Sequence, residues 1–219
     1  MSYWCSNDKC GFTHETNFQQ GQINMNTELG NFIYNISLNE TYTNFLEIGT
    51  WNGLGSTKCF IEGLNKRNKE YNFYSLECNQ EKCEFAQKLY QNYNNVHILN
   101  EVLLNRMPDD IYKIFPEILA NSDLKYWNDI DYKNMENKKL FLDRPDIPDI
   151  FDVILLDGGE FTTWYEFQIV KDRCKILLLD DTNTFKCNKI MSLLQSDKNW
   201  ECIFTSNERN GTAVFSRNI

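Results

Sequence analysis

Residues 45–57 read FLEIGTWNGLGST, and this stretch decides the fold. Apolar residues lead into Glu47 and Gly49, and small residues follow before a helix that we expect to begin near Leu54. Glycine permits positive φ and a close approach of the backbone, and the first turn of a helix presents free N–H groups. A strand that stops at glycines and feeds a helix is therefore typical of a site for a nucleotide-like cofactor.

The spacing of the glycines points to the kind of cofactor. It is Gly49-x-x-x-Gly53-x-Gly55, whereas dinucleotide-binding folds carry Gly-x-Gly-x-x-Gly. A longer loop between the first two glycines suits a ligand without a pyrophosphate, so we expect S-adenosylmethionine, and an ordinary strand-to-helix turn is the alternative. The expected cofactor-binding residues in this stretch are Glu47, Gly49, Thr50, Gly53, Gly55, Ser56 and Thr57.

The composition excludes several classes of protein. The chain has 219 residues, of which 42% are hydrophobic, so it fits one domain with its own core. The net charge of −9 argues against a nucleic-acid partner, because neutralising phosphates needs a basic surface. No run of about 18 apolar residues occurs, and the N-terminus lacks the apolar core of a signal peptide. We therefore expect no membrane partner and a cytoplasmic location, and a homo-oligomer stays open.

The first half of the chain alternates between helices and strands. Residues 1–43 predict a polar arm and then a helix capped by Thr27. Strands follow at 45–48, 72–76 and 96–99, and Asn79 can cap a helix between the last two. Glu77 ends the second of these strands, where a carboxylate can accept both hydroxyls of an adenosine ribose. A solvated charge at a strand end is the alternative reading.

Residues 105–150 interrupt this alternation. The segment holds four prolines, a helical piece at 111–119 and a polar run that includes Trp127. It is too long for a plain crossover in a compact domain. We expect an insertion near the mouth of the site that covers the substrate, with a surface embellishment as the alternative.

The last part of the chain returns to strands. Residues 151–156 and 175–179 are strongly apolar and predict central parallel strands buried on two faces, with a helix at 164–171 between them and another at 186–194. Apolar runs at 200–205 and 212–216 flank Asn210-Gly211, which signals a hairpin and an antiparallel final strand. The sequence therefore predicts an α/β protein with an antiparallel hairpin at one edge of its sheet.

Acids follow the strands of this predicted sheet. Ligands of open α/β sheets bind outside the carboxyl ends of the strands, so these acids should converge there. They are Glu77, Asp157, Glu160, Asp180 and Asp181.

Grouped carboxylates repel one another, so either one takes a proton or a cation intervenes. We expect a divalent ion, Mg²⁺ before Mn²⁺ or Ca²⁺, held by Asp157, Asp180 and Asp181, because hard cations prefer oxygen ligands. The ion would lower the pKa of a bound hydroxyl, and Glu160 would remove the proton. In the alternative reading, Asp181 and Thr182 cap the next helix and Asp157 serves its turn through backbone contacts.

These residues together resemble the class I S-adenosylmethionine-dependent methyltransferases. The resemblance extends over residues 45–215 and rests on Glu47-x-Gly49-x-x-x-Gly53-x-Gly55, on Glu77 and on the acids at the paired strand ends. It implies a Rossmann-like, mostly parallel seven-stranded sheet with an antiparallel hairpin edge and helices on both faces.

Within that class, Asp157-Gly158 followed by Asp180-Asp181 is similar to the metal-dependent sugar O-methyltransferases of the macrocin O-methyltransferase type. In those enzymes the first Asp and the Asp pair bind magnesium, and an Asp two positions after the first acts as base. This chain departs from the pattern, because Gly159 stands at the base position and Glu160 follows it. The expected catalytic residues are therefore Asp157, which matches the pattern, and Glu160, which stands next to the position of the missing base.

Residues 157–163, DGGEFTT, also look like small methyltransferases of large algal viruses that decorate rhamnose on capsid glycans, which would place the protein in a host cytoplasm. The expected function is therefore methylation of a sugar hydroxyl, with Trp127 or Trp164 offering a face for the sugar ring. A catechol or phenol O-methyltransferase and a cofactor-binding module without catalysis are the alternatives.

Overall fold

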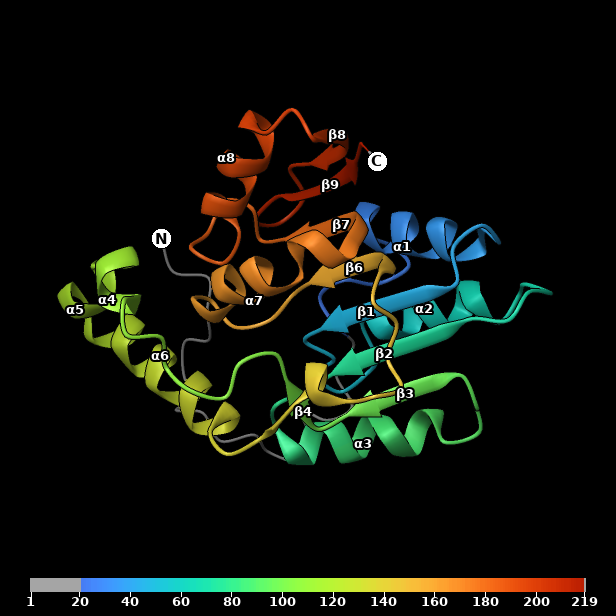
Figure 1. Cartoon of the computed structure of the whole chain (residues 1–219), viewed down its shortest axis with the longest axis horizontal. Helices are drawn as coiled ribbons and strands as arrows, with labels where there is room; N and C mark the ends of the chain where they lie inside the picture. The colour runs from blue at the N-terminus through green and yellow to red at the C-terminus, as the bar shows by residue number, and fades with distance from the viewer. Residues whose placement is uncertain (1–20, 219) are drawn as a thin grey trace.

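The computed structural model describes residues 21–218, and Figure 1 shows them built around one sheet. The strands of this seven-stranded sheet lie in the order β3-β2-β1-β6-β7-β9-β8. Their bounds are β1 Asn44–Ile48, β2 Asn72–Leu76, β3 Val96–Leu99, β6 Phe151–Leu156, β7 Cys174–Asp180, β8 Trp200–Ser206 and β9 Thr212–Arg217.

Strand directions confirm the predicted fold class. β1 pairs in parallel with β2 and β6, β2 with β3, and β6 with β7, while β9 runs antiparallel to both β7 and β8. The strand order reverses between β1 and β6, which is where open α/β sheets bind ligands. The fold is therefore Rossmann-like, with the antiparallel hairpin at one edge.

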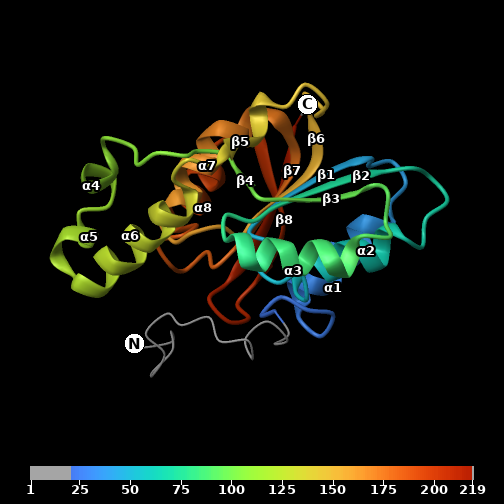
Figure 2. The ribbon, with the colours of Figure 1, turned by 90° about the horizontal axis from the view of Figure 1, so that it is seen from below.

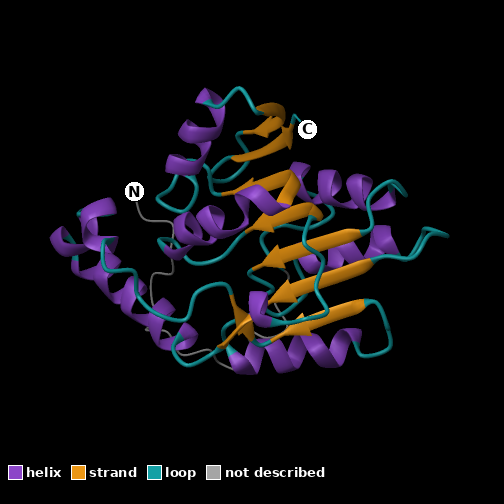
Figure 3. Ribbon diagram, in the orientation of Figure 1, coloured by secondary structure: helices purple, strands orange, loops and turns teal. Residues whose placement is uncertain are grey.

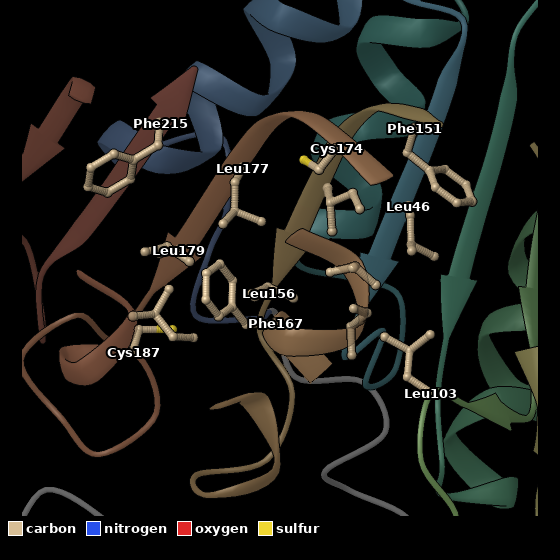
Figure 4. Packing of buried hydrophobic residues seen from close by; sticks show 14 of the residues in the cluster. Leu46, Leu103, Phe151, Leu156, Phe167, Cys174, Leu177, Leu179, Cys187 and Phe215 are labelled. Carbon is tan, nitrogen blue, oxygen red and sulfur yellow. The ribbon is translucent and has the colours of Figure 1, made fainter. Parts of the chain in front are cut away.

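Helices cover both faces of the sheet. Side chains alternate along each strand, so that Phe45 packs with helices α1 and α2 whereas Leu46 packs with α7 and α8. Figure 4 shows part of the second cluster, in which Leu46, Leu177 and Phe167 gather between the sheet and α7. The helix bounds are α1 Glu28–Leu38, α2 Ser56–Leu64, α3 Gln80–Tyr90, α7 Thr162–Val170 and α8 Asn188–Ser196.

Helix starts were predicted with mixed success. The Thr27 side chain accepts the N–H of Gly30 and the Asn79 side chain accepts that of Lys82, so both predicted caps are confirmed. The helix after the glycines begins at Ser56 and not near Leu54, because the chain needs those residues to complete its turn. The part of the predicted arm in residues 1–20 lies outside the described residues.

The segment at 105–150 is more helical than its composition suggests. Helices α4 Ile111–Ile114, α5 Glu117–Ala120 and α6 Ser122–Met135 form it, and β5 Lys139–Leu140 returns to pair with β4 Glu101–Val102. The predicted polar run is helix α6, whose start is capped by the Asn121 side chain and whose inner face packs through Tyr132 and Met135. Figures 2 and 3 show α6 beyond the ends to which the arrowheads of β1, β2 and β3 point.

None of the described helices is long and apolar enough to cross a membrane.

Candidate active site at the carboxyl ends of the strands

A sharp corner joins β1 to α2. Gly49 has a φ of +100°, and a Cβ on it would lie closer than 3.0 Å to the backbone oxygen of Asp157. The N–H groups of Gly49 and Thr50 both donate to the oxygen of Leu76, at 3.0 and 3.1 Å. The corner is therefore clamped between the ends of β2 and β6, and only glycine fits at its first position.

A buried carboxylate stabilises this corner through hydrogen bonds. Glu47 is fully buried, and its carboxylate accepts hydrogen bonds from the hydroxyls of Ser56, Thr57 and Ser75. Ser75 in turn is hydrogen-bonded to the hydroxyl of Thr50. The side chains of Glu47, Ser56 and Thr57 thus join β1 to the first turn of α2 and, through Ser75, to β2. Their contact with a cofactor stays a prediction.

The environment of Glu47 makes folding sensitive to pH. Burial raises the pKa of Glu47 to about 7, although the three hydroxyl donors lower it. The folded protein therefore holds this proton at pH values where the unfolded chain, with a pKa near 4.5, has lost it. Because the folded state binds more protons in this window, the free energy of unfolding falls as the pH rises through it.

We expect Glu47→Gln to remove this dependence. The difference in free energy of unfolding between wild type and variant should fall by about 3 kcal/mol between about pH 5 and pH 8, at about 1.4 kcal/mol per pKa unit. Urea unfolding at the two pH values measures it. Glu62→Gln, which removes an exposed carboxylate on helix α2, should follow the wild-type curve. If the difference in free energy of unfolding between wild type and Glu47→Gln does not change with pH, this account is wrong.

Glu77 lies beside the glycine loop, as the sequence predicts. Its Oε2 accepts the N–H of Trp51 at 2.7 Å, and its Oε1 accepts the N–H of Asn79 at 2.8 Å. Burial raises the pKa of Glu77 to about 7, against the effect of these two donors. The thiol of Cys78 also donates to Oε1, at 3.8 Å. An ionised carboxylate has about four acceptor sites, so Oε2 can still accept a hydroxyl, and a second hydroxyl would replace the thiol at Oε1.

The three aspartates predicted to bind metal come together. Asp157 follows β6, Asp180 ends β7 and Asp181 comes next, and one carboxylate oxygen from each lies within 4.8 Å of the others. Asp181 has a φ of +57°, a left-handed conformation that Asp tolerates better than most residues. We call these three residues the aspartate cluster.

The proposed capping role of Asp181 is wrong. Helix α8 begins only at Asn188, and its N-terminus has no side-chain cap. The carboxylate of Asp181 instead accepts from the ammonium of Lys186 at 2.7 Å and from the side-chain amide of Asn210 at 2.9 Å.

Two cations that the sequence analysis missed neutralise the aspartate cluster. The buried ammonium of Lys186 bonds Asp157 at 2.9 Å as well as Asp181, and the guanidinium of Arg209 bonds Asp180 at 3.1 Å. The sequence pattern predicted Lys186 at the start of a helix and Arg209 in a hairpin turn. No local signal marks either one, because their partners lie at least five residues away along the chain.

The charges in the cluster are not balanced. Three carboxylates face two cations, and burial together with Asp157 and Asp181 raises the pKa of Asp180 to about 7. Burial also raises the pKa of Asp157, whereas Lys186 and Asn210 outweigh burial and lower the pKa of Asp181. The Oδ1 atom of Asp180 is buried without a hydrogen-bond partner between residues 21 and 218.

This donor set fits a hard divalent cation. Three carboxylates at short separation and one orphaned oxygen are the ligands that such ions prefer. The ammonium of Lys186 already bonds two of the three, so an ion would have to compete with it.

Glu160 lies next to the aspartate cluster but outside it. Its Oε1 accepts the backbone N–H of Lys186 at 3.3 Å. The structure thus brings Glu160, Asp157 and Lys186 to one place, in the turn between β6 and α7 and the turn between β7 and α8. The role of Glu160 as a base stays a prediction.

The Rossmann-like fold is shared with solved structures of other proteins. No protein-family model matches the chain, and no curated protein matches it in sequence. Solved structures do match it in fold, each at low sequence identity.

The chain is similar to an O-methyltransferase from Bacillus cereus in complex with SAH, at 12% identity and a TM-score of 0.60, over 93% of this chain and 86% of that one. It is similar to a putative caffeoyl-CoA O-methyltransferase from Staphylococcus aureus, at 13% identity and a TM-score of 0.55, over 87% and 83%. It is also similar to TomG from Streptomyces achromogenes, an O-methyltransferase involved in tomaymycin synthesis and solved with SAM, at 11% identity and a TM-score of 0.55, over 87% and 80%.

Proposed function

We propose that the protein is an S-adenosylmethionine-dependent O-methyltransferase. The observation that carries this proposal is the juxtaposition of Glu77 with the glycine loop at one strand end and of the aspartate cluster at the neighbouring ends. Similar structures solved with SAH or SAM support it. A cytoplasmic location and a viral origin stay predictions.

The chain's own residues would bind and orient the two substrates. Backbone groups from Gly49 to Gly55 hold the amino-acid part of the cofactor, and Glu77 accepts its ribose hydroxyls. S-adenosylmethionine supplies a methyl group that its sulfonium already activates. The protein therefore has to align the acceptor oxygen with that methyl group and manage the proton of the acceptor.

We propose that a sugar hydroxyl is the methyl acceptor, with rhamnose among the candidate sugars. Helix α6 carries the half-buried Trp127 and the exposed Tyr126 beside it, and aromatic faces suit sugar rings. Trp164 packs against Phe167 and two hydrophobic clusters, which favours a structural role for it. A catechol or phenol is the second candidate, because a fold neighbour is described as a putative caffeoyl-CoA O-methyltransferase.

Mg²⁺ is the ion we propose for the aspartate cluster. Asp157, Asp180 and Asp181 would hold it, and Lys186 would give up its bonds to two of them. A bound ion would lower the pKa of the acceptor hydroxyl.

Calorimetry with S-adenosylhomocysteine, with and without Mg²⁺, tests the cofactor. We expect Glu77→Gln to weaken binding about 10–100-fold, because the amide offers one acceptor oxygen where two N–H groups and two hydroxyls need bonds. Glu84→Gln removes a carboxylate on the exposed face of α3 and should leave the affinity unchanged. Wild-type protein that binds no S-adenosylhomocysteine would end the proposal.

Turnover with methyl glycosides, including methyl α-L-rhamnoside, and with catechols then separates the two acceptor classes. We expect methylation of the glycosides. Methylation of catechols alone would select the second candidate. An unchanged rate in EDTA would contradict a role for Mg²⁺.

A further inference from the structure

Two carboxylates lie directly over the glycines that follow Asp157. A Cβ on Gly159 would come closer than 3.0 Å to the Oδ2 of Asp131, and one on Gly158 would come within 2.5 Å of the Oε2 of Glu166. Asp131 belongs to α6 of the insertion, and Glu166 belongs to α7. The carboxylate of Asp131 therefore occupies the space that a side chain at position 159 would fill.

Polar atoms beside Asp131 lack partners. Glu166 is only 5% exposed, yet its Oε2 has no hydrogen-bond partner in the described part of the chain. The same holds for the Oγ1 of Thr162, which a Cβ on Gly159 would meet at 2.7 Å. Buried polar atoms are nearly always hydrogen-bonded, so these atoms indicate a place for hydroxyl groups of a ligand.

The other acids of the site are already engaged. Asp157 and Asp181 bond the ammonium of Lys186, and Asp180 bonds Arg209. Glu160 accepts a backbone N–H from Lys186. Asp131 is half-buried, and its carboxylate lies beside Gly159 and Glu160 in the turn after β6.

We propose that Asp131 is the base that takes the proton from the acceptor hydroxyl, with Glu166 and Thr162 binding neighbouring hydroxyls of the same acceptor. This proposal rests on the proposed methyltransferase function. The acceptor oxygen forms a bond to the methyl carbon of the sulfonium donor, and the bond from that carbon to sulfur breaks with its electron pair on sulfur. The proton of the acceptor passes to the Asp131 carboxylate and then to water.

The electrostatics of Asp131 suit this role. Burial raises the pKa of Asp131 to about 7, with Glu160 adding to the rise and Lys186 opposing it. A base with a pKa near the working pH combines a useful ionised fraction with a real affinity for the proton. The titratable groups that face it are Lys186, Glu160, Glu166, Cys78 and Tyr132.

The test compares Asp131→Asn with Glu160→Gln, using methyl α-L-rhamnoside and a catechol as acceptors. We expect Asp131→Asn to lower kcat about 10²–10⁴-fold and to leave the affinity for S-adenosylhomocysteine within about twofold. The rise of wild-type kcat/KM through about pH 7 should disappear in this variant and persist in Glu160→Gln. Asp131→Glu should recover part of the rate.

Asp129→Asn is the matched control, because it removes an exposed carboxylate of the same helix that pairs only with Lys125 in the described structure. It should keep the wild-type rate and pH profile, and thermal unfolding should show all variants folded. A wild-type rate in Asp131→Asn, or loss of the pH limb in Glu160→Gln alone, would overturn the assignment of Asp131. Wild-type protein that fails to bind S-adenosylhomocysteine, or binds it and methylates neither class of acceptor, would overturn the proposed function itself.

Discussion

Lys186→Met should lower the free energy of unfolding by about 3–5 kcal/mol, the usual cost of removing one partner from a buried ion pair. The ammonium bonds Asp157 and Asp181, and burial leaves the carboxylate of Asp181, whose side chain is 2% exposed, little water to replace it. Millimolar Mg²⁺ should restore much of the loss, because an ion that binds only the folded state stabilises it. Thermal unfolding with and without Mg²⁺ measures both effects.

Lys175→Met provides the comparison. Its ammonium bonds Asp152 at 2.7 Å, but the Lys175 side chain is 46% exposed and lies at the other end of β7. We expect a cost of about 1 kcal/mol or less and no response to Mg²⁺. If Mg²⁺ stabilises Lys186→Met no more than it stabilises wild type, the aspartate cluster does not take a divalent ion.

Gly49→Ala should abolish measurable binding of S-adenosylhomocysteine, which corresponds to a loss of at least about 100-fold, since a displacement of about 1 Å at a site can have this effect. The new methyl group would meet the backbone oxygen of Asp157, and the φ of +100° is one that alanine does not adopt without strain. The strain and the overpacking should each cost about 1–3 kcal/mol of stability. Calorimetry and urea unfolding measure the two losses separately.

Gly63→Ala separates instability from loss of the site. Its Cβ would lie 2.6 Å from the backbone oxygen of Tyr34, where α2 packs on α1. The variant should lose stability through the same kind of overpacking but keep its affinity for S-adenosylhomocysteine. Equal loss of affinity in both variants would mean that Gly49 matters for folding alone.

The sequence predicted the strands and the cofactor side of the site because both depend on local patterns. The apolar runs at 151–156 and 175–179 suit central strands, and residues 45–57 carry their turn in closely spaced glycines. Glu77 could be placed beside the glycine loop because the ends of adjacent parallel strands meet at one edge of a sheet.

The acceptor side could not be predicted in the same way. Asp131 comes from a helix that read as a polar run, and its place over Gly159 depends on how α6 packs, not on any spacing. Lys186 and Arg209 likewise reach the aspartates through turns whose geometry only the folded chain defines. Long-range pairing of charges leaves no period or motif in a single sequence.

The turn between β8 and β9 has a consequence for how the protein is made. Arg209 binds both Asp180 and Gln22, and Glu208 accepts the N–H of Glu28 at 2.7 Å, so this turn joins early and late parts of the chain. On the ribosome, Asp180 emerges well before Arg209, which offsets its charge. The Asp180 carboxylate must therefore stay hydrated or protonated until the β8–β9 hairpin is synthesised, and the aspartate cluster is completed only after that hairpin.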